Sequence, residues 1–154
     1  MKKYSKIIFV CLGNTCRSPI AATILNELKG NREILVSSRG MVVLFPEPYN
    51  PKAVAVSSSH GMIMPSNSAR ELEEADFGND TLVLTMTADI KQKIYAEFEN
   101  PINVYTLQEY AGVEETEAVM DPYGKGIDEY GRCFELLYVL VEKVAEHLFD
   151  EEKD

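Results

Sequence analysis

A cysteine and an arginine with five residues between them form a segment that could carry covalent phosphoryl chemistry. Residues 11–18 read Cys-Leu-Gly-Asn-Thr-Cys-Arg-Ser. A loop of this length can turn several backbone N–H groups toward one point and thereby bind an anion. A helix that begins at Arg17 would add the positive end of its dipole, and the guanidinium would match two phosphate oxygens. The same field would stabilise a thiolate on Cys11, which makes this cysteine a candidate nucleophile.

The predicted phosphate-binding loop consists of Leu12, Gly13, Asn14, Thr15, Cys16, Arg17 and Ser18. We expect Gly13 to supply backbone conformations that a side chain would forbid, and Ser18 to donate a hydrogen bond to the Cys11 thiolate. The alternative is a small buried cysteine that ends a core strand, followed by a solvated arginine. No Gly-Lys-Ser/Thr closes the segment as in a Walker loop, and no second cysteine pair completes a zinc site. We therefore predict that no metal is bound.

A second candidate group for the same chemistry is Asp121, which opens an Asp-Pro-Tyr sequence at residues 121–123. Cleavage of a phosphorylated side chain needs a proton for the leaving group and later a base for the hydrolytic water. One carboxyl group can do both. The alternative is an aspartate that only initiates a turn ahead of a proline. The cysteine loop upstream favours the catalytic role.

Together, the two motifs resemble the low-molecular-weight protein-tyrosine-phosphatase family. Residues 10–19, VCLGNTCRSP, match its C-x5-R-[S/T]-P pattern, and the Asp-Pro-aromatic motif follows about a hundred residues downstream, as in that family. The resemblance extends over a single domain, residues 1–154. It implies that Cys11 accepts the phosphoryl group as a phosphocysteine, that Arg17 and the loop amides hold the phosphoryl oxygens, and that Asp121 is the general acid. It implies no cofactor.

The resemblance also implies roles for residues around the nucleophile. Asn14, Ser18 and Ser38 would brace the loop, and Cys16 would be a redox partner that traps oxidised Cys11 as a disulfide. The sequence departs from the family after Ser38, where Arg-Gly stands in place of small residues. It also has Asn67 where many relatives have histidine.

The expected substrate class depends on Thr15 and Tyr123. Many tyrosine-directed relatives carry isoleucine where Thr15 stands. The combination of this threonine with Asp-Pro-Tyr-Gly at residues 121–124 resembles the bacterial protein-arginine-phosphatase branch. We therefore favour phosphoarginine, with phosphotyrosine as the alternative, because Tyr123 suits an aromatic ring as well as a guanidinium plane.

Two further classes are remote alternatives. An arsenate reductase of the same fold would need two more cysteines near the third strand, and none lies between Cys16 and Cys133. A non-catalytic phosphate-binding module would be expected to lack Cys11 or Asp121, and both are present.

Strands that alternate with helices must position these residues. Short apolar runs predict strands at residues 7–11, 34–38, 81–85 and 102–105. Helical patterns cover residues 17–29, 52–60, 68–74 and 87–98, and a final helix is capped by Asp128. This order predicts an α/β single-domain three-layer sandwich, with a four-stranded parallel sheet and helices on both faces. Ligands of such sheets bind at the carboxyl ends of the strands, which places the phosphate loop directly after the first strand.

The charge of the chain restricts its partners. The formal net charge is −10 over 154 residues, which argues against nucleic acid and anionic membranes as partners. The imbalance is local, since residues 1–108 hold 11 basic and 11 acidic residues and residues 109–154 hold 4 and 14. The phosphate loop therefore lies in the neutral part. Three cysteines are too few for a disulfide framework, and no apolar run is long enough to span a membrane, so we expect a cytoplasmic protein. The family resemblance implies phosphorylated proteins as its partners.

Overall fold

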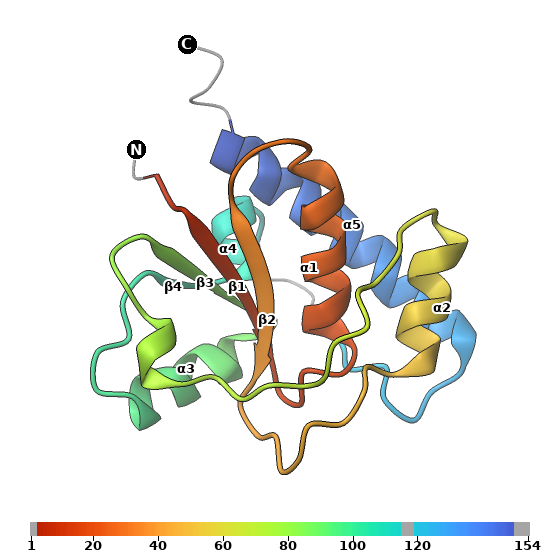
Figure 1. The fold of residues 1–154 in the computed structure, drawn as a ribbon, viewed down its shortest axis with the longest axis horizontal. Coiled ribbons are helices and arrows are strands. Elements are labelled where there is room, and N and C mark those ends of the chain that lie inside the picture. Colours follow the sequence, from red (N-terminus) through yellow and green to blue (C-terminus); the bar gives the residue numbers. More distant parts are fainter. Residues whose placement is uncertain (1–2, 115–118, 150–154) are drawn as a thin grey trace.

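A parallel four-stranded sheet forms the centre of the computed structural model, which describes residues 3–114 and 119–149 (Figure 1). Its strands, in the spatial order β2-β1-β3-β4, are β2 (Leu35–Gly40), β1 (Lys6–Cys11), β3 (Thr81–Thr85) and β4 (Val104–Thr106). In the central register, Phe9 lies between Ser38 and Leu84. β3 is buried along its whole length and β1 almost so, because aliphatic side chains point to both faces and both faces are covered.

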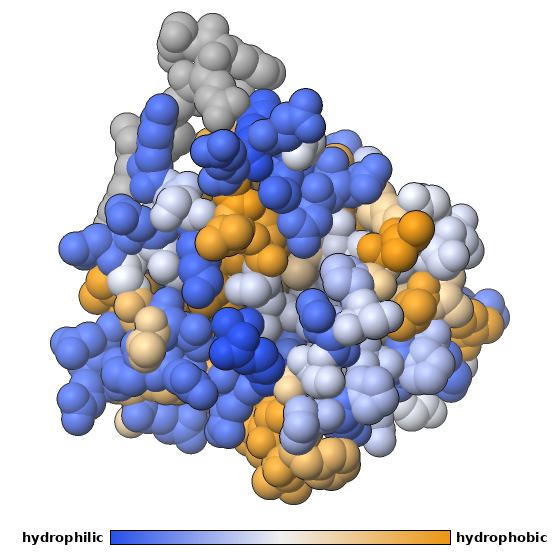
Figure 2. Space-filling view, viewed as in Figure 1, coloured by the Kyte–Doolittle hydropathy of each residue, from blue (hydrophilic) through white to orange (hydrophobic). Residues whose placement is uncertain are grey.

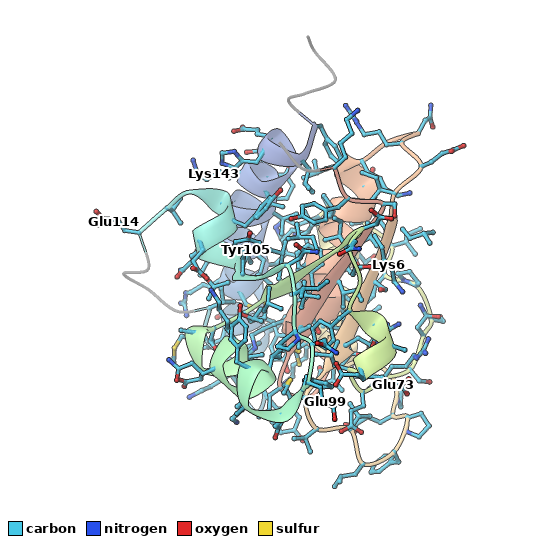
Figure 3. All side chains as sticks on the ribbon, turned by 90° about the vertical axis from the view of Figure 1, so that its left-hand side faces the viewer. Lys6, Glu73, Glu99, Tyr105, Glu114 and Lys143 are labelled. Carbon is cyan, nitrogen blue, oxygen red and sulfur yellow. The ribbon has the colours of Figure 1, made fainter. Side chains whose placement is uncertain are left out.

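Helices cover both faces of the sheet and confirm the predicted three-layer architecture. They are α1 (Arg17–Leu28), α2 (Pro51–Ser59), α3 (Ala88–Glu97), α4 (Leu107–Ala111) and α5 (Ile127–Phe149). α1 and α5 pack against each other on one face, with α2 against both. α3 lies on the opposite face, as Figure 1 and the side view in Figure 3 show.

The long helix α5 buries one apolar stripe. The stripe includes Cys133, Leu137, Leu140, Val141 and Val144, which are buried, and Leu148, which is half-buried. Polar residues occupy the rest of the helix surface, as expected for a helix that packs on one side. Within residues 3–114 and 119–149, no helix is both long enough and apolar enough to cross a membrane.

The strands that follow β1 in the chain lie on opposite sides of it, so the strand order reverses at β1. The chain leaves β1 for β2 on one side, and β3 pairs with β1 on the other. In open parallel sheets, ligand sites form beyond the carboxyl ends of strands at such a point. The loop between β1 and α1 occupies it, as predicted from the sequence.

Two local predictions were wrong. Residues 68–74 are not helical, because Gly40 N–H donates to Arg70 O and Leu72 N–H to Gly40 O, so this segment pairs with the end of β2. A short 3₁₀ helix, Glu74–Asp76, follows it. Helix α5 begins at Ile127, which places Asp128 inside the first turn and not at the cap.

The short helix α4 was not anticipated from the sequence. Its start carries a capping box, in which Thr106 Oγ1 accepts from Glu109 N–H and Glu109 Oε1 accepts from Thr106 N–H. The Thr-x-x-Glu spacing at residues 106–109 is the sequence signal for this start.

Candidate active site

A cleft of about 280 Å³ opens at the carboxyl edge of the sheet. It is lined by Cys11, Leu12, Gly13, Thr15, Cys16, Arg17, Val42, Glu47, Asp121 and Tyr123. The predicted nucleophile, cation, acid and two specificity residues therefore meet in one cleft. Val42 and Glu47 were not predicted to be part of it.

Cys11 ends β1 at the floor of this cleft and is almost completely buried. Its Sγ accepts a hydrogen bond from the Asn14 backbone N–H at 3.2 Å and lies 2.9 Å from Ser18 Oγ. Both groups can donate to a thiolate, so the loop is arranged to stabilise negative charge on this sulfur.

Asn14 holds the loop in shape through both ends of its side chain. Its Nδ2 donates to Ser18 Oγ at 2.9 Å and to Ser38 Oγ at 2.8 Å, while its Oδ1 accepts from Arg70 N–H at 2.8 Å. The backbone of Asn14 has φ +57°, so the left-handed residue is Asn14 and not Gly13, contrary to the sequence expectation. Asparagine tolerates this region better than most residues, and its hydrogen bonds compensate for the strain.

Ser18 has one hydroxyl proton and two acceptors within reach. Its Oγ accepts a hydrogen bond from Asn14 Nδ2. Its hydroxyl can therefore donate a hydrogen bond either to Cys11 Sγ or to Arg39 O, which is 3.3 Å away. When the sulfur is a thiolate, the charged acceptor makes the stronger hydrogen bond. The serine is therefore positioned to respond to the ionisation of Cys11.

The position next to Ser38 is taken by Tyr49, whose Oη lies 3.5 Å from Ser38 Oγ. Asn67, which replaces the histidine of many relatives, is exposed and lines a separate cavity behind the loop. The predicted hydrogen bonds among Asn14, Ser18 and Ser38 are thus present, and Tyr49 extends this network beyond Ser38.

Gly40 at the end of β2 allows the loop to pack closely. A Cβ built at this position would lie 2.9 Å from both Asn14 N and Gly13 C. These atoms belong to the backbone of the phosphate loop, so they cannot move aside without displacing it. The Arg-Gly sequence after Ser38 therefore includes a glycine that the loop requires.

Replacing Gly40 with alanine is expected to lower kcat/KM by roughly 10- to 100-fold, because a loop displaced by a few tenths of an ångström no longer matches the transition state. Steady-state kinetics with p-nitrophenyl phosphate would measure this loss. The matched control is Gly131→Ala in α5, where an added Cβ meets nothing within 4 Å. That control should keep its activity and become slightly more stable. Equal activity in both variants would contradict the packing role of Gly40.

Arg17 connects the two motifs across the cleft. Its guanidinium is buried, donates through Nη1 to Val119 O at 3.1 Å and places Nη2 3.7 Å from Asp121 Oδ2. Asp121 is half-exposed, and its Oδ1 accepts from the Tyr123 N–H at 3.0 Å. Asp121 therefore initiates a turn, as the alternative interpretation expected, and it also faces the cleft.

The start of α1 is open toward the cleft. Its N-cap residue, Cys16, makes no side-chain capping hydrogen bond, and the first turn contains no acidic residue. Helical N–H groups without an internal partner then face an anion bound in the loop, as the sequence analysis expected.

Cys16 lines the cleft, and its thiol contacts two hydroxyl groups. Its Sγ is 3.4 Å from Tyr130 Oη and 3.7 Å from Thr15 Oγ1. Burial raises the pKa of the Cys16 thiol, so it is protonated at neutral pH. All three cysteines are free thiols, and the disulfide of Cys16 with Cys11 stays a prediction. Burial also raises the pKa of Cys133 to about 12, in keeping with its core position.

The part of the chain that the structure describes holds no group of three or more His, Cys, Asp or Glu side chains placed to bind a metal. The cationic groups identified in the cleft are Arg17 and the N-terminal end of α1.

Comparison with known proteins places this cleft in a family. The family model for low molecular weight phosphotyrosine protein phosphatase matches residues 6–154. The chain belongs to this family. The phosphatase is 36% identical over 139 residues to the low molecular weight protein-tyrosine-phosphatase PtpB of Staphylococcus haemolyticus, covering 90% of this chain and 96% of that protein.

Two solved structures resemble this phosphatase closely. The YwlE arginine phosphatase from Geobacillus stearothermophilus superposes with a TM-score of 0.86 at 29% identity, covering 96% of this chain and 95% of that one. A cysteine-to-serine mutant of YwlE arginine phosphatase, with a phosphorylated active-site serine, gives 0.83 at 30% identity, covering 96% of this chain and 98% of that one. Both the fold and the enzyme class predicted from the sequence are confirmed.

Proposed function

We propose that this phosphatase removes the phosphoryl group from phosphoarginine side chains of proteins through a phosphocysteine on Cys11. One observation carries the proposal. Cys11 Sγ lies on the floor of a cleft beneath the loop amides, and the Arg17–Asp121 pair lines the same cleft. A nucleophile, a cation for the phosphoryl oxygens and a proton donor are what phosphoryl transfer through a covalent intermediate requires.

In the first step the Cys11 thiolate attacks phosphorus, and the phosphorus–nitrogen bond breaks. Asp121 gives its proton to the departing nitrogen, so arginine leaves as its ordinary cation. Arg17 and the backbone N–H groups of residues 12–17 hold the phosphoryl oxygens as their charge distribution changes. Arg17 must therefore stay in position while Asp121 is protonated and their ion pair is lost. The hydrogen bond from Arg17 Nη1 to Val119 O does not depend on the charge of Asp121 and supports this requirement.

In the second step a water molecule attacks the phosphocysteine. The Asp121 carboxylate takes a proton from this water, the phosphorus–sulfur bond breaks, and its electron pair returns to Cys11 as thiolate. Ser18, whose Oγ lies 2.9 Å from the sulfur, can donate a hydrogen bond to the departing thiolate and so stabilise it. The products are inorganic phosphate and the regenerated enzyme.

Two features favour phosphoarginine. Thr15 presents a hydroxyl in the cleft, which can accept a hydrogen bond from a guanidinium N–H, and the protonated Asp121 can accept another through its carbonyl oxygen. The neighbouring YwlE structures are of arginine phosphatases, and the phosphorylated serine in one of them is at the active site. That phosphoserine supports a covalent step here by analogy.

Phosphotyrosine is the second candidate substrate. Leu12, Val42 and Tyr123 line the cleft with exposed apolar surface, which suits an aromatic ring. The relative PtpB of Staphylococcus haemolyticus is named a protein-tyrosine-phosphatase.

Kinetics with two peptides of identical flanking sequence, one with phosphoarginine and one with phosphotyrosine, tests the choice. The wild type is expected to prefer phosphoarginine. Replacing Thr15 with isoleucine removes the hydroxyl and adds bulk, and should lower the phosphoarginine-to-phosphotyrosine ratio of kcat/KM by roughly tenfold or more.

The Thr15→Ser variant is the control, since it keeps the hydroxyl and should keep the preference. A wild type that prefers phosphotyrosine, with a ratio that Thr15→Ile leaves unchanged, would contradict the phosphoarginine assignment and favour phosphotyrosine.

The catalytic cysteine favours a particular cellular compartment. A catalytic thiol must remain reduced, and free thiols persist in the cytoplasm. We therefore propose cytoplasmic phosphorylated proteins as the partners of this enzyme.

A further inference from the structure

The loop between β2 and α2 is fixed to the phosphate loop at both of its ends. Met41 N–H donates to Cys11 O at 3.1 Å, Val42 N–H to Leu12 O at 2.9 Å, and Asn50 N–H to Thr15 O at 2.9 Å. Asn50 also caps α2, with Pro51 at the first helical position. Residues 41–50 therefore keep a constant position relative to the cleft.

Glu47 lies within this fixed loop, between two prolines. Its N–H donates to Phe45 O at 2.8 Å, and its carbonyl accepts from Ala69 N–H at 2.8 Å. The backbone is thus held on both sides, while the exposed side chain lines the cleft. Within residues 3–114 and 119–149, the Glu47 carboxylate has no cationic partner and no hydrogen bond.

The loop that carries Glu47 also exposes apolar side chains. Val42, Leu44 and Phe45 are all more than half exposed, and Figure 2 shows this apolar surface at the lower end of the molecule, over the β2–α2 loop. A charge pair formed beside such surface is less screened by water than one on an open polar face.

The cleft is lined by groups of both charges. The positive groups are Arg17 and the start of α1, and the acidic side chains are Asp121 and Glu47. A ligand that fits carries a dianion at its tip and a cation directly behind it. Phosphoarginine has this arrangement, because its guanidinium is bonded to the phosphoryl group, whereas phosphotyrosine has a neutral ring there.

Asp121 cannot supply the negative charge for such a cation throughout the reaction. In the first step it must be protonated to act as an acid, and in the resting structure it faces Arg17 at 3.7 Å. A carboxylate that binds the substrate cation throughout the reaction must come from another residue, and Glu47 is the other acidic side chain lining the described cleft.

We infer that Glu47 is a specificity-determining residue whose carboxylate binds the guanidinium of the phosphorylated arginine. This inference rests on the proposed phosphoarginine phosphatase activity. It assigns to the β2–α2 loop the recognition of a cationic substrate, separately from the groups that perform the chemistry.

The test measures kcat and KM of Glu47→Gln and Glu47→Asp on matched phosphoarginine and phosphotyrosine peptides with uncharged flanking residues. Glu47→Gln should lower the phosphoarginine-to-phosphotyrosine ratio of kcat/KM by roughly three- to tenfold, mainly through a higher KM for phosphoarginine. Glu47→Asp keeps the charge and should recover part of the ratio. Raising the ionic strength should weaken the preference in the wild type and not in Glu47→Gln.

Glu33→Gln is the matched control, since it removes the same charge from an exposed site at the opposite end of the sheet and should leave the ratio unchanged. If the wild type hydrolyses phosphoarginine and Glu47→Gln leaves the ratio unchanged, the inference is wrong and the proposed function stands. It is also wrong if the ratio falls only for peptides with added flanking lysines. If the wild type does not hydrolyse phosphoarginine, both fail.

Discussion

Replacing Cys11 with serine is expected to lower kcat/KM about 10⁴-fold or more for phosphoarginine and phosphotyrosine peptides alike. The geometry around the sulfur would survive, because a serine Oγ can keep the contacts with Asn14 N–H and Ser18 Oγ. The chemistry would not, because a hydroxyl ionises far less readily than a thiol and is a poor nucleophile toward phosphorus without a base. The cleft offers no imidazole to serve as that base.

Two measurements separate this loss from misfolding. The variant should bind inorganic phosphate as the wild type does, because Arg17 and the loop amides are untouched. The control Cys133→Ala, in the apolar stripe of α5, should keep its turnover at a cost of about 1 kcal/mol in stability. Persistent turnover in Cys11→Ser would overturn the covalent mechanism.

Rapid-quench kinetics of the wild type with p-nitrophenyl phosphate should show a burst of p-nitrophenol, which reports formation of the phosphocysteine.

Replacing Asp121 with asparagine should give the second largest effect. We expect kcat/KM to fall by roughly 10²- to 10³-fold for phosphopeptides, whose leaving groups need a proton, and far less for p-nitrophenyl phosphate, whose leaving group does not. Asparagine is nearly isosteric, and its Oδ1 can still accept from Tyr123 N–H, so the turn should persist. The difference between the two substrates therefore reports proton transfer.

The alternative role for Asp121 is to position Arg17 through their 3.7 Å ion pair. Loss of that role would weaken phosphate binding and slow both substrates equally, which would contradict general acid catalysis. Asp128→Asn removes a nearby exposed carboxylate that does not line the cleft and should have little effect on either substrate.

Prediction from the sequence succeeded where local pattern decides the structure. The aliphatic runs of β1 and β3 have no other favourable environment than a covered parallel sheet, so their assignment followed from the residues alone. It failed where partners distant in sequence decide. Residues 68–74 carry a helical pattern, yet hydrogen bonds to Gly40 keep them extended. Gly13 seemed the residue to take a left-handed conformation, yet the anchoring of the Asn14 side chain to Ser38 and Arg70 places it one residue later.

The sequence by itself determined the reacting groups and their order along the chain. The loop from Cys11 to Ser18 is a local motif whose amides, helix start and arginine act within a few residues of one another. Only the tertiary structure decided how the distant residues are placed: it sets Asp121 opposite Arg17, packs Gly40 against the loop backbone, and adds Glu47 from the β2–α2 loop. The physical reason is that strand order brings these segments together, and contacts between them depend on packing that no local pattern encodes.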